Sequence, residues 1–189
     1  NFQMEVEGLS YPDAVRALAK RAGMEVPEDE QYQSRYRQQE RLWALHKEAA
    51  RYFHSQLYSP AGEECLAYAQ KRGMTKSTLT RFGVGFAPNS WSGLVDAMRA
   101  KGYTDQELRD AGLVSEKNGR IFDRFRNRFM FPIIDVRGNV IGFGGRIIRN
   151  DKDTAKYLNS PETLIFNKRK NLFGLNLAKK TKQNYMYLV

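Results

Sequence analysis

The chain has 189 residues, of which 41% are hydrophobic and 28% charged, a composition typical of a globular protein with a buried core. No apolar run approaches the roughly 18 residues that a membrane-spanning helix needs, and the opening stretch, NFQMEVEGLS, lacks the pattern of a signal peptide. The net charge of +10 is unevenly placed, because residues 1–119 carry 16 basic and 16 acidic side chains whereas residues 120–189 carry 15 and 5.

A basic field confined to the last part of the chain favours a polyanionic partner. Nucleic acid fits best, and an acidic protein or a membrane surface are the alternatives. Cys65 is the only cysteine, which excludes an intrachain disulfide or a multi-cysteine zinc site in these residues and indicates a reducing, cytoplasmic setting. His46 and His54 are the only histidines and form no His-Glu-x-x-His motif, so we expect them on a helix surface rather than at a metal.

The first half of the chain has helical patterns. Residues 8–23 predict one helix, capped by Ser10 and ended by Gly23, and an acidic, proline-containing linker follows it. Residues 29–57 predict a long helix, because an apolar stripe recurs at spacings of three and four: Leu42, Leu45, Ala49, Tyr52 and Phe53. Its apolar stripe is expected to pack in a core.

Residues 61–115 predict a run of short helices with recognisable ends. One ends at Gly73, the next has Thr75 as its cap, and a third begins near Asn89 or Ser90. A fourth has Thr104 and Glu107 as a capping box and stops at Gly112, while VGFAP between the second and third is short and extended. Together with the β-rich segments that follow, these helices predict an α+β fold, in which a helical N-terminal region precedes a mixed, largely antiparallel β subdomain.

The period changes from residue 120 onward. MFPIID and NVIGFGGRII predict an antiparallel β-hairpin around the turn VRGN, with Pro132 at an edge or with its nitrogen facing away from the ladder. SPET predicts a helix start with Ser160 as its cap. NLFGLNLAKK predicts a short helix, and NYMYLV at the end of the chain predicts the start of a buried strand.

The segment DRFRNRF combines basic and aromatic residues at alternate positions. In an extended strand, Arg124, Arg126 and Arg128 share one face, and Phe125 and Phe129 share the other with Asn127. This predicts a cationic front that Arg146 can join and that faces phosphates. A solvated edge strand is the alternative.

Three glycines in VIGFGGRII, at positions 142, 144 and 145, predict that something approaches this backbone closely. A phosphate, a base and a packed helix all fit, and ordinary tight packing or a bulge is the alternative. No Gly-Lys-Ser/Thr sequence follows, so the stretch is not a P-loop.

The segment KYLNSPETLIFNKRKN suits single-stranded nucleic acid. Lys156 and Lys168 supply charge, Tyr157 offers a ring on which a base can stack, and Asn159 can pair with a base edge or a sugar. Taken singly, a core tyrosine and an ordinary helix cap remain alternatives. Carboxylates are sparse here, and Asp151 and Asp153 fall in what reads as a flexible loop, so the residues predict binding rather than catalysis.

Two long stretches, GRIFDRFRNRFMFPIIDVRGNVIGFGGRII and KYLNSPETLIFNKRKNLFGL, resemble the bacterial DnaG-type DNA primases. LSYPDAVRALAKRAGMEVP and YAQKRGMTKSTLTRFGVGFAPNSW also resemble that family, and the similarity is weakest across residues 28–55. The chain does not begin with methionine, so we expect a piece of a longer protein. The resemblance implies that 1–27 are the tail of a zinc-binding domain with a linker, that 28–182 are the N-terminal subdomain of the catalytic core, and that 183–189 begin a Toprim subdomain.

The resemblance also implies a function, namely synthesis of short RNA primers on single-stranded template DNA. Catalytic carboxylates with Mg²⁺ or Mn²⁺ would lie in the Toprim part and Zn²⁺ in the upstream domain, so no metal and no catalytic residue is expected in this chain, which alone would be inactive. The implied partners are template DNA, RNA primer, nucleoside triphosphates and, through a C-terminal domain, the replicative helicase. A monomer without membrane contact is expected.

Nine residues are carried over as site residues. The resemblance assigns Arg124, Arg126 and Arg146 to template phosphates, and Lys156 and Asn159 to the phosphates of the incoming nucleotide or to the primer. The remaining members of the basic surface are Arg72, Trp91, Tyr157 and Lys168, the last on template or triphosphate. A non-enzymatic module that binds single-stranded DNA is the main alternative, and a domain that binds an acidic protein is the second.

Overall fold

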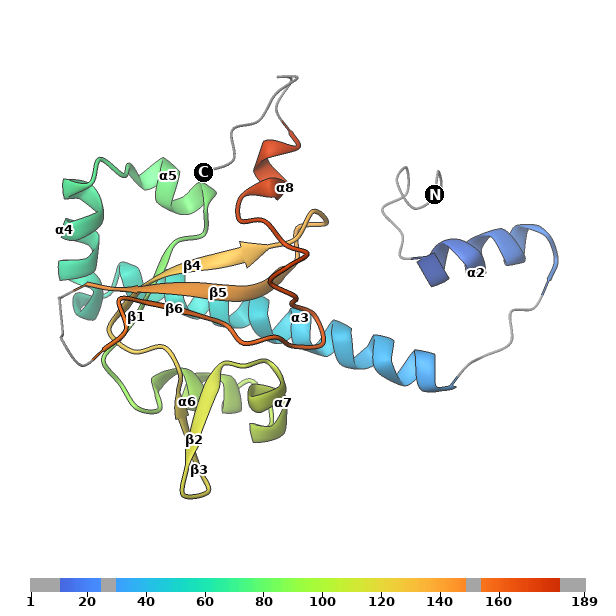
Figure 1. Ribbon diagram of the computed structural model, residues 1–189, viewed down its shortest axis with the longest axis horizontal. Coiled ribbons are helices and arrows are strands. Elements are labelled where there is room, and N and C mark those ends of the chain that lie inside the picture. The colour runs from blue at the N-terminus through green and yellow to red at the C-terminus, as the bar shows by residue number, and fades with distance from the viewer. Residues whose placement is uncertain (1–10, 25–29, 149–153, 181–189) are drawn as a thin grey trace. The chain divides into compact units, whose positions relative to one another are not determined.

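The computed structural model describes residues 11–24, 30–148 and 154–180, drawn in colour in Figure 1. The chain divides into two compact units, residues 1–38 and 39–189. Helices come first and an antiparallel sheet follows, which confirms the predicted α+β class. The predicted terminal strand NYMYLV and the pair Asp151 and Asp153 lie outside the described residues.

The first unit contains helix α2 (Tyr11–Arg21) and the beginning of α3 (Glu30–Leu57). α2 ends where predicted, because Gly23 adopts a left-handed φ of 66° and the amide of Met24 donates to the carbonyl of Ala19 at 2.9 Å. Ser10, its expected cap, lies outside the described residues. Tyr36 on α3 donates to Asp13 on α2 at 3.2 Å.

The second unit is built on a four-stranded antiparallel sheet in the order β1-β4-β5-β6. Its strands are β1 (Gly85–Ala87), β4 (Arg128–Ile134), β5 (Val140–Ile147) and β6 (Tyr157–Asn159). α3 packs against one face with the predicted apolar stripe, and α6 (Gly93–Arg99) and α7 (Asp105–Asp110) complete this core around Met130 and Phe143 (Figure 1). The buried members of the stripe are Leu42, Leu45, Ala49 and Phe53.

The opposite face of the sheet carries a second, smaller core. The 3-10 turn η1 (Pro60–Gly62), α4 (Glu63–Lys71) and α5 (Lys76–Arg81) supply it, and they pack on Phe86 of β1 and Phe129 of β4. The predicted ends are confirmed, since Gly73 has a φ of 76° and the hydroxyl of Thr75 accepts from the amide of Thr78 at 3.2 Å. α8 (Leu175–Ala178) is the predicted last short helix.

The region from α6 to β4 contains one confirmed cap and one element that the sequence analysis missed. Thr104 and Glu107 form the predicted capping box of α7. α6 begins at Gly93 rather than near Asn89 or Ser90. The missed element is a separate two-stranded hairpin of β2 (Val114–Lys117) and β3 (Arg120–Asp123), which lies beside α6 and α7 in Figure 1.

The predicted hairpin around VRGN is confirmed as β4 and β5, with Gly138 at a φ of 93° in the turn. β1 pairs only with residues 128–130 of β4. Pro132 therefore lies where β4 has β5 on one side and, among the described residues, an open edge on the other, so the missing amide hydrogen leaves no partner there unpaired.

The prediction that Arg124, Arg126 and Arg128 share one face of a strand is wrong. β4 begins only at Arg128, and Asn127 before it has a left-handed φ of 51°, so the alternation of an extended strand does not apply. Arg128 is buried and donates to the carbonyls of Gly145 at 3.3 Å and Ala155 at 2.9 Å. Phe125 and Phe129 belong to the two different cores.

Two further expectations are corrected. No helix begins at Ser160, which is buried and exchanges hydrogen bonds with Phe143, because its amide donates to that carbonyl at 2.8 Å and its hydroxyl accepts from that amide at 2.9 Å. His46 is fully buried on α3 rather than on a helix surface, with its ring stacked on Phe143 at 5.8 Å.

The three glycines of β5 make room for side chains of the protein itself. A Cβ on Gly145 would lie 3.0 Å from Cδ of Arg128 and 3.1 Å from Phe125, and a Cβ on Gly144 would lie 3.1 Å from the side-chain oxygen of Asn159. Gly142 faces Phe166 in the same way, at 3.3 Å. Tight packing, the alternative weighed from the sequence, therefore accounts for the close approach.

Candidate nucleic-acid interface

One face of the sheet places the predicted residues of β5 and β6 side by side. Directly paired residues of antiparallel strands point to the same face, and the register pairs Arg146 with Phe129 and Tyr157. Two residues along, Gly144 pairs with Phe131 and Asn159 on that same face. Since Gly144 has no side chain, this face of the sheet is recessed between Phe131 and Asn159.

Basic and aromatic side chains alternate at one end of this face. The guanidinium carbons of Arg72 and Arg146 each lie 5.4 Å from the ring centroid of Tyr68. Arg146 also lies 5.9 Å from the ring of Tyr157, and the ammonium of Lys156 lies 5.8 Å from that ring. We call Arg72, Tyr68, Arg146, Tyr157 and Lys156 the cation–aromatic row.

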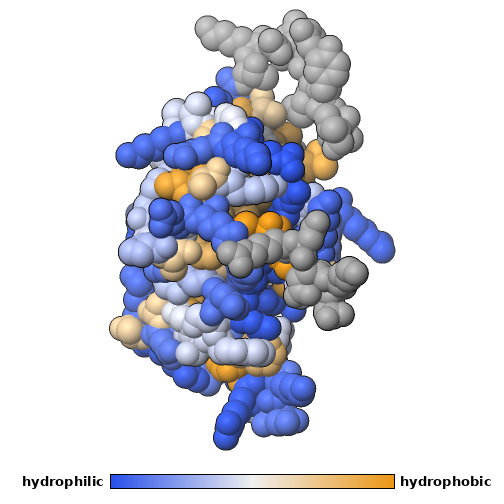
Figure 2. Space-filling model, turned by 90° about the vertical axis from the view of Figure 1, so that its left-hand side faces the viewer, coloured by the Kyte–Doolittle hydropathy of each residue, from blue (hydrophilic) through white to orange (hydrophobic). Residues whose placement is uncertain are grey.

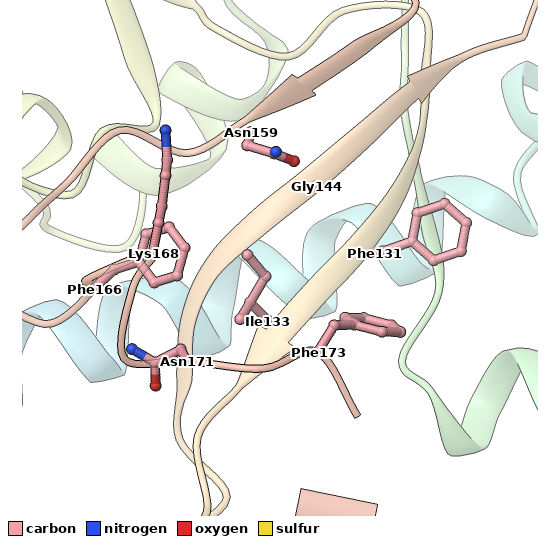
Figure 3. A pocket seen from close by; sticks show the side chains of 8 residues that line it. All are labelled: Phe131, Ile133, Gly144, Asn159, Phe166, Lys168, Asn171 and Phe173. Atoms are coloured by element: carbon pink, nitrogen blue, oxygen red, sulfur yellow. The ribbon is translucent and has the colours of Figure 1, made fainter. Parts of the chain in front are cut away.

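A cavity of about 320 Å³ lies next to the row on the same face. Figure 3 shows Asn159 and Gly144 on adjacent strands, and Lys168 lines the same cavity from the segment that crosses the sheet. The cavity also has an aromatic part, in which Phe131 and Phe173 meet edge to face at 6.3 Å. Its size is at the lower end of the range for pockets that hold small molecules.

Arg124 lies in the connection before β4 and contacts Asn159, one of the residues that line the cavity. Its guanidinium donates to the backbone carbonyl of Asn159 at 3.4 Å. Burial lowers the pKa of Arg124, which a guanidinium tolerates without losing its charge. The connection therefore brings a fixed positive charge to the end of β6.

Trp91 and Arg126 form a separate stack beside β3. The guanidinium carbon of Arg126 lies 3.9 Å from the ring centroid of Trp91 and 5.2 Å from that of Phe122, and one of its nitrogens donates to the carbonyl of Asp123 at 2.9 Å. The Trp91 side is open, with 65% of the residue exposed. A flat, exposed ring backed by a cation is suited to stacking with a nucleobase.

The basic side chains of the candidate site differ from other basic side chains in their electrostatic partners. Arg41, Arg99 and Lys101, for example, contact carboxylates at 2.5–2.8 Å. In the described part of the chain, no carboxylate oxygen lies within 4.0 Å of the charged side-chain nitrogens of the site cations, which are Arg72, Arg124, Arg126, Arg146, Lys156 and Lys168; the carboxylate of Glu162 meets only the backbone amide of Lys168, from which it accepts at 2.9 Å. Figure 2 shows that the side of the molecule on the left of Figure 1, where α4 and the β1 end of the sheet lie, is mostly hydrophilic. Within the described residues, no direct ion pair therefore neutralises the charges of the site cations.

The structure thus brings most of the predicted site residues together and divides them differently. Arg72, Arg146, Lys156 and Tyr157 lie in the row, Asn159 and Lys168 line the cavity, and Arg124 contacts Asn159. Trp91 and Arg126 form their own stack. The sequence analysis missed four aromatic residues at these places: Tyr68, Phe122, Phe131 and Phe173. For Tyr68 a signal was available, because it lies four residues before Arg72 on a predicted helix and side chains at that spacing share a face.

The described residues limit what this surface can do chemically. Within residues 11–24, 30–148 and 154–180, no three histidine, cysteine, aspartate or glutamate side chains gather as a metal site would require. Asp123, the last residue of β3, is buried, and its carboxylate lies at the start of α6, where it accepts from the amides of Leu94 at 2.8 Å and Val95 at 3.0 Å. In the same residues no helix combines the length and apolar character needed to cross a membrane.

Known proteins resemble this chain over most of its length. Residues 52–179 match the family of DNA primase catalytic cores, N-terminal domain. A DNA primase of Clostridium acetobutylicum is 42% identical over 181 residues, which cover 95% of this chain and 30% of that protein. The chain therefore spans about a third of the length of the curated relatives that it matches.

Solved structures give the same result. A DnaG primase catalytic domain bound to ssDNA is 41% identical, with a TM-score of 0.70, over 77% of this chain and 45% of that one. The Aquifex aeolicus primase, solved with its zinc-binding and RNA polymerase domains, is 32% identical with a TM-score of 0.65 over 93% of this chain and 41% of that one. The chain belongs to the DnaG-type bacterial DNA primase family, and its residues 52–179 are an N-terminal domain of the primase catalytic core.

Proposed function

We propose that the chain is part of a bacterial replicative primase, a DNA-directed RNA polymerase that makes short RNA primers on single-stranded DNA. The observation that carries this proposal is the set of six site cations whose side chains have no carboxylate partner in the described residues. Five of them lie among aromatic rings around β5 and β6, and Arg126 lies in its own stack with Trp91 beside β3. Single-strand binding combines such charges, which follow the phosphates, with rings on which bases stack. The proposed reaction, primer synthesis, is taken from the chain's membership of the DNA primase family.

We further propose how the surface is divided between template and nucleotide. Arg72, Arg146 and Arg126 hold template phosphates, and Trp91 stacks with a template base. Asn159 and Lys168 share one cavity, which supports a place there for the incoming nucleotide, with Lys168 on its phosphates. The two remaining contacts to that nucleotide or to the primer come from Lys156 and Tyr157, while Arg124 holds the template strand next to Asn159.

The metal chemistry of the reaction lies elsewhere in the proposed primase. Two-metal nucleotidyl transfer requires clustered carboxylates, and the described residues do not form such a cluster. We therefore propose that carboxylates with Mg²⁺ or Mn²⁺ reside in a Toprim subdomain that residues 183–189 begin, and that Zn²⁺ belongs to a domain of which residues 1–27 are the tail. Residues 28–182 then form the N-terminal subdomain, and this chain alone has no polymerase activity.

The remaining parts of the proposal concern the setting of the protein. The complete primase is a cytoplasmic monomer that meets the replicative helicase through a C-terminal domain. The chain described here contributes the binding surface only.

Lys156→Ala in the complete primase tests the enzymatic proposal. The residue is exposed, so its loss should leave the melting temperature within about 1–2 °C while primer synthesis falls at least tenfold. Lys47→Ala, an exposed lysine on α3, is the matched control and should leave both quantities unchanged. Unchanged synthesis in the Lys156 variant, or an equal loss in both variants, would contradict the assigned role.

A non-enzymatic module that binds single-stranded DNA is the second candidate, and the lack of a carboxylate cluster in the described residues favours it. Both candidates predict DNA binding, so the reaction decides between them. Template-dependent incorporation of ribonucleotides by the complete polypeptide supports the primase, whereas DNA binding without incorporation under the same conditions supports the module.

A further inference from the structure

Tyr68 occupies the centre of the cation–aromatic row, although the sequence motifs give it no role. It lies on α4, one turn before Arg72, and its ring meets Phe129 edge to face at 6.1 Å. Arg146 reaches the same ring from β5. Both guanidinium carbons lie 5.4 Å from its centroid, so the two carbons can be no farther apart than twice that distance. The ring therefore holds two like charges within a small area.

Two neighbouring guanidinium groups repel each other and need a partner that fixes their positions. Elsewhere in the described residues a carboxylate provides it, as Asp105 does for Arg99 at 2.8 Å. In the row, the Nε of Arg146 is buried and has no hydrogen-bond acceptor among the described residues. The rings of Tyr68 and Tyr157 lie near its guanidinium instead, at 5.4 and 5.9 Å.

An aromatic ring and a carboxylate differ in what they leave for a ligand. A carboxylate cancels the positive charge that it holds. The face of a ring attracts a cation through its quadrupole and carries no net charge, so the cation keeps its full charge toward an anion on its other side. The packing of Tyr68 on Phe129 fixes the ring, and the ring in turn can fix both guanidinium groups.

We propose that Tyr68 is a positioning residue of the DNA interface: its ring holds Arg72 and Arg146 together, uncancelled, for neighbouring phosphates of a single strand. This inference rests on the proposed function and adds to it a residue that touches no DNA. It predicts that the electron density of the ring, and not only its volume, determines DNA affinity.

Replacements at Tyr68 in the 189-residue chain test the inference by fluorescence anisotropy with a single-stranded oligodeoxynucleotide. Tyr68→Phe keeps the ring and should bind within about twofold of the wild type. Tyr68→Leu removes the ring face and should bind about tenfold more weakly, which corresponds to about 1.4 kcal/mol. In an Arg146→Ala background the same Leu replacement should cost clearly less, because one of its two cations is already absent.

A fluorination series separates positioning from packing. Phenylalanine analogues with one, two or three ring fluorines keep the shape of the ring and progressively weaken its attraction for a cation. Affinity should fall stepwise along the series while the melting temperature stays constant, and this test also covers the case in which Tyr68→Leu does not fold. Equal affinities along the series, or a Leu effect that is undiminished in the Arg146→Ala background, would overturn the inference.

Failure of the proposed function has a different signature. In that case the wild-type chain itself would bind the oligonucleotide with no dependence on salt, or would not bind it, whatever stands at position 68.

Discussion

The buried histidine of α3 makes the stability of this domain depend on pH in a calculable way. His46 is fully buried, and its Nδ1 lies 2.9 Å from the carbonyl of Leu42, to which it donates. Burial lowers the pKa of His46 from 6.5 to about 4. Between these two values the unfolded chain takes up a proton at this site and the folded chain does not, so the free energy of unfolding falls as the pH falls.

The size of the effect follows from the two pKa values. Each pH unit of that interval is worth about 1.4 kcal/mol, so acidification from pH 6.5 to about 4 should remove about 3 kcal/mol of stability, with no contribution from His46 above that range. Urea unfolding at a series of pH values measures this for the wild type and for His46→Met, which cannot titrate.

The difference between the two proteins isolates the histidine. Glu48 and Asp105, whose pKa values are lowered by their partners Lys101 and Arg99, titrate in both proteins and cancel. The stability of the wild type minus that of the variant should therefore drop with falling pH at about 1.4 kcal/mol per pH unit below pH 6.5. A difference that stays constant from pH 7 to pH 4 would refute the reasoning.

Two further changes test the packing of the sheet and the stack beside β3. Gly145→Ala places a Cβ about 3 Å from Arg128, Met130 and Phe125, so it should lower the free energy of unfolding in urea by about 1–3 kcal/mol. Gly138→Ala is the control, because a Cβ there would contact nothing within 4 Å and any loss of stability would come from its φ of 93°. An unchanged stability of Gly145→Ala would contradict the close packing. Trp91→Ala removes an exposed ring and should weaken binding to a single-stranded oligonucleotide by about 1–3 kcal/mol with little change in melting temperature, and undiminished binding would exclude Trp91 from the interface.

Local signals in the sequence predicted the fold well where a structure depends on neighbouring residues. The long helix α3, the capping box of Thr104 and Glu107, and the β4–β5 hairpin all follow from spacing and turn chemistry. The β2–β3 hairpin was missed although its signal is equally local. Asn118 and Gly119 both have positive φ, as a tight turn of that kind requires.

The errors concern residues whose environment is set by distant segments. Arg128 is polar in any sequence pattern, but the missing side chain of Gly145 opens a site for it inside the domain. The sequence around Ser160 is typical of a helix cap, but in the fold the backbone of Ser160 pairs with Phe143. His46 is buried because other segments cover the apolar stripe of α3 next to it. A sequence pattern cannot report what packs against a side chain from elsewhere in the chain.

The candidate site shows the same division. Charge segregation and the family motifs predicted its basic residues, because those properties can be read along the chain. The grouping could not be read in this way. Tyr68 lies far from Arg146 in sequence, and only the packing of α4 on the sheet brings them together. The cavity likewise joins Asn159 to Lys168 because the segment after β6 crosses back over β5.

The central claim is that the cations without carboxylate partners form the DNA interface, and the salt dependence of binding tests it most directly. The affinity of the 189-residue chain for a single-stranded oligodeoxynucleotide should fall with salt at a log–log slope of about −0.7 for each phosphate contacted. Arg146→Ala should make that slope shallower by about 0.7, and Arg99→Ala, which removes an arginine paired with Asp105, should leave it unchanged. A slope near zero for the wild type, or equal changes in the two variants, would contradict the account.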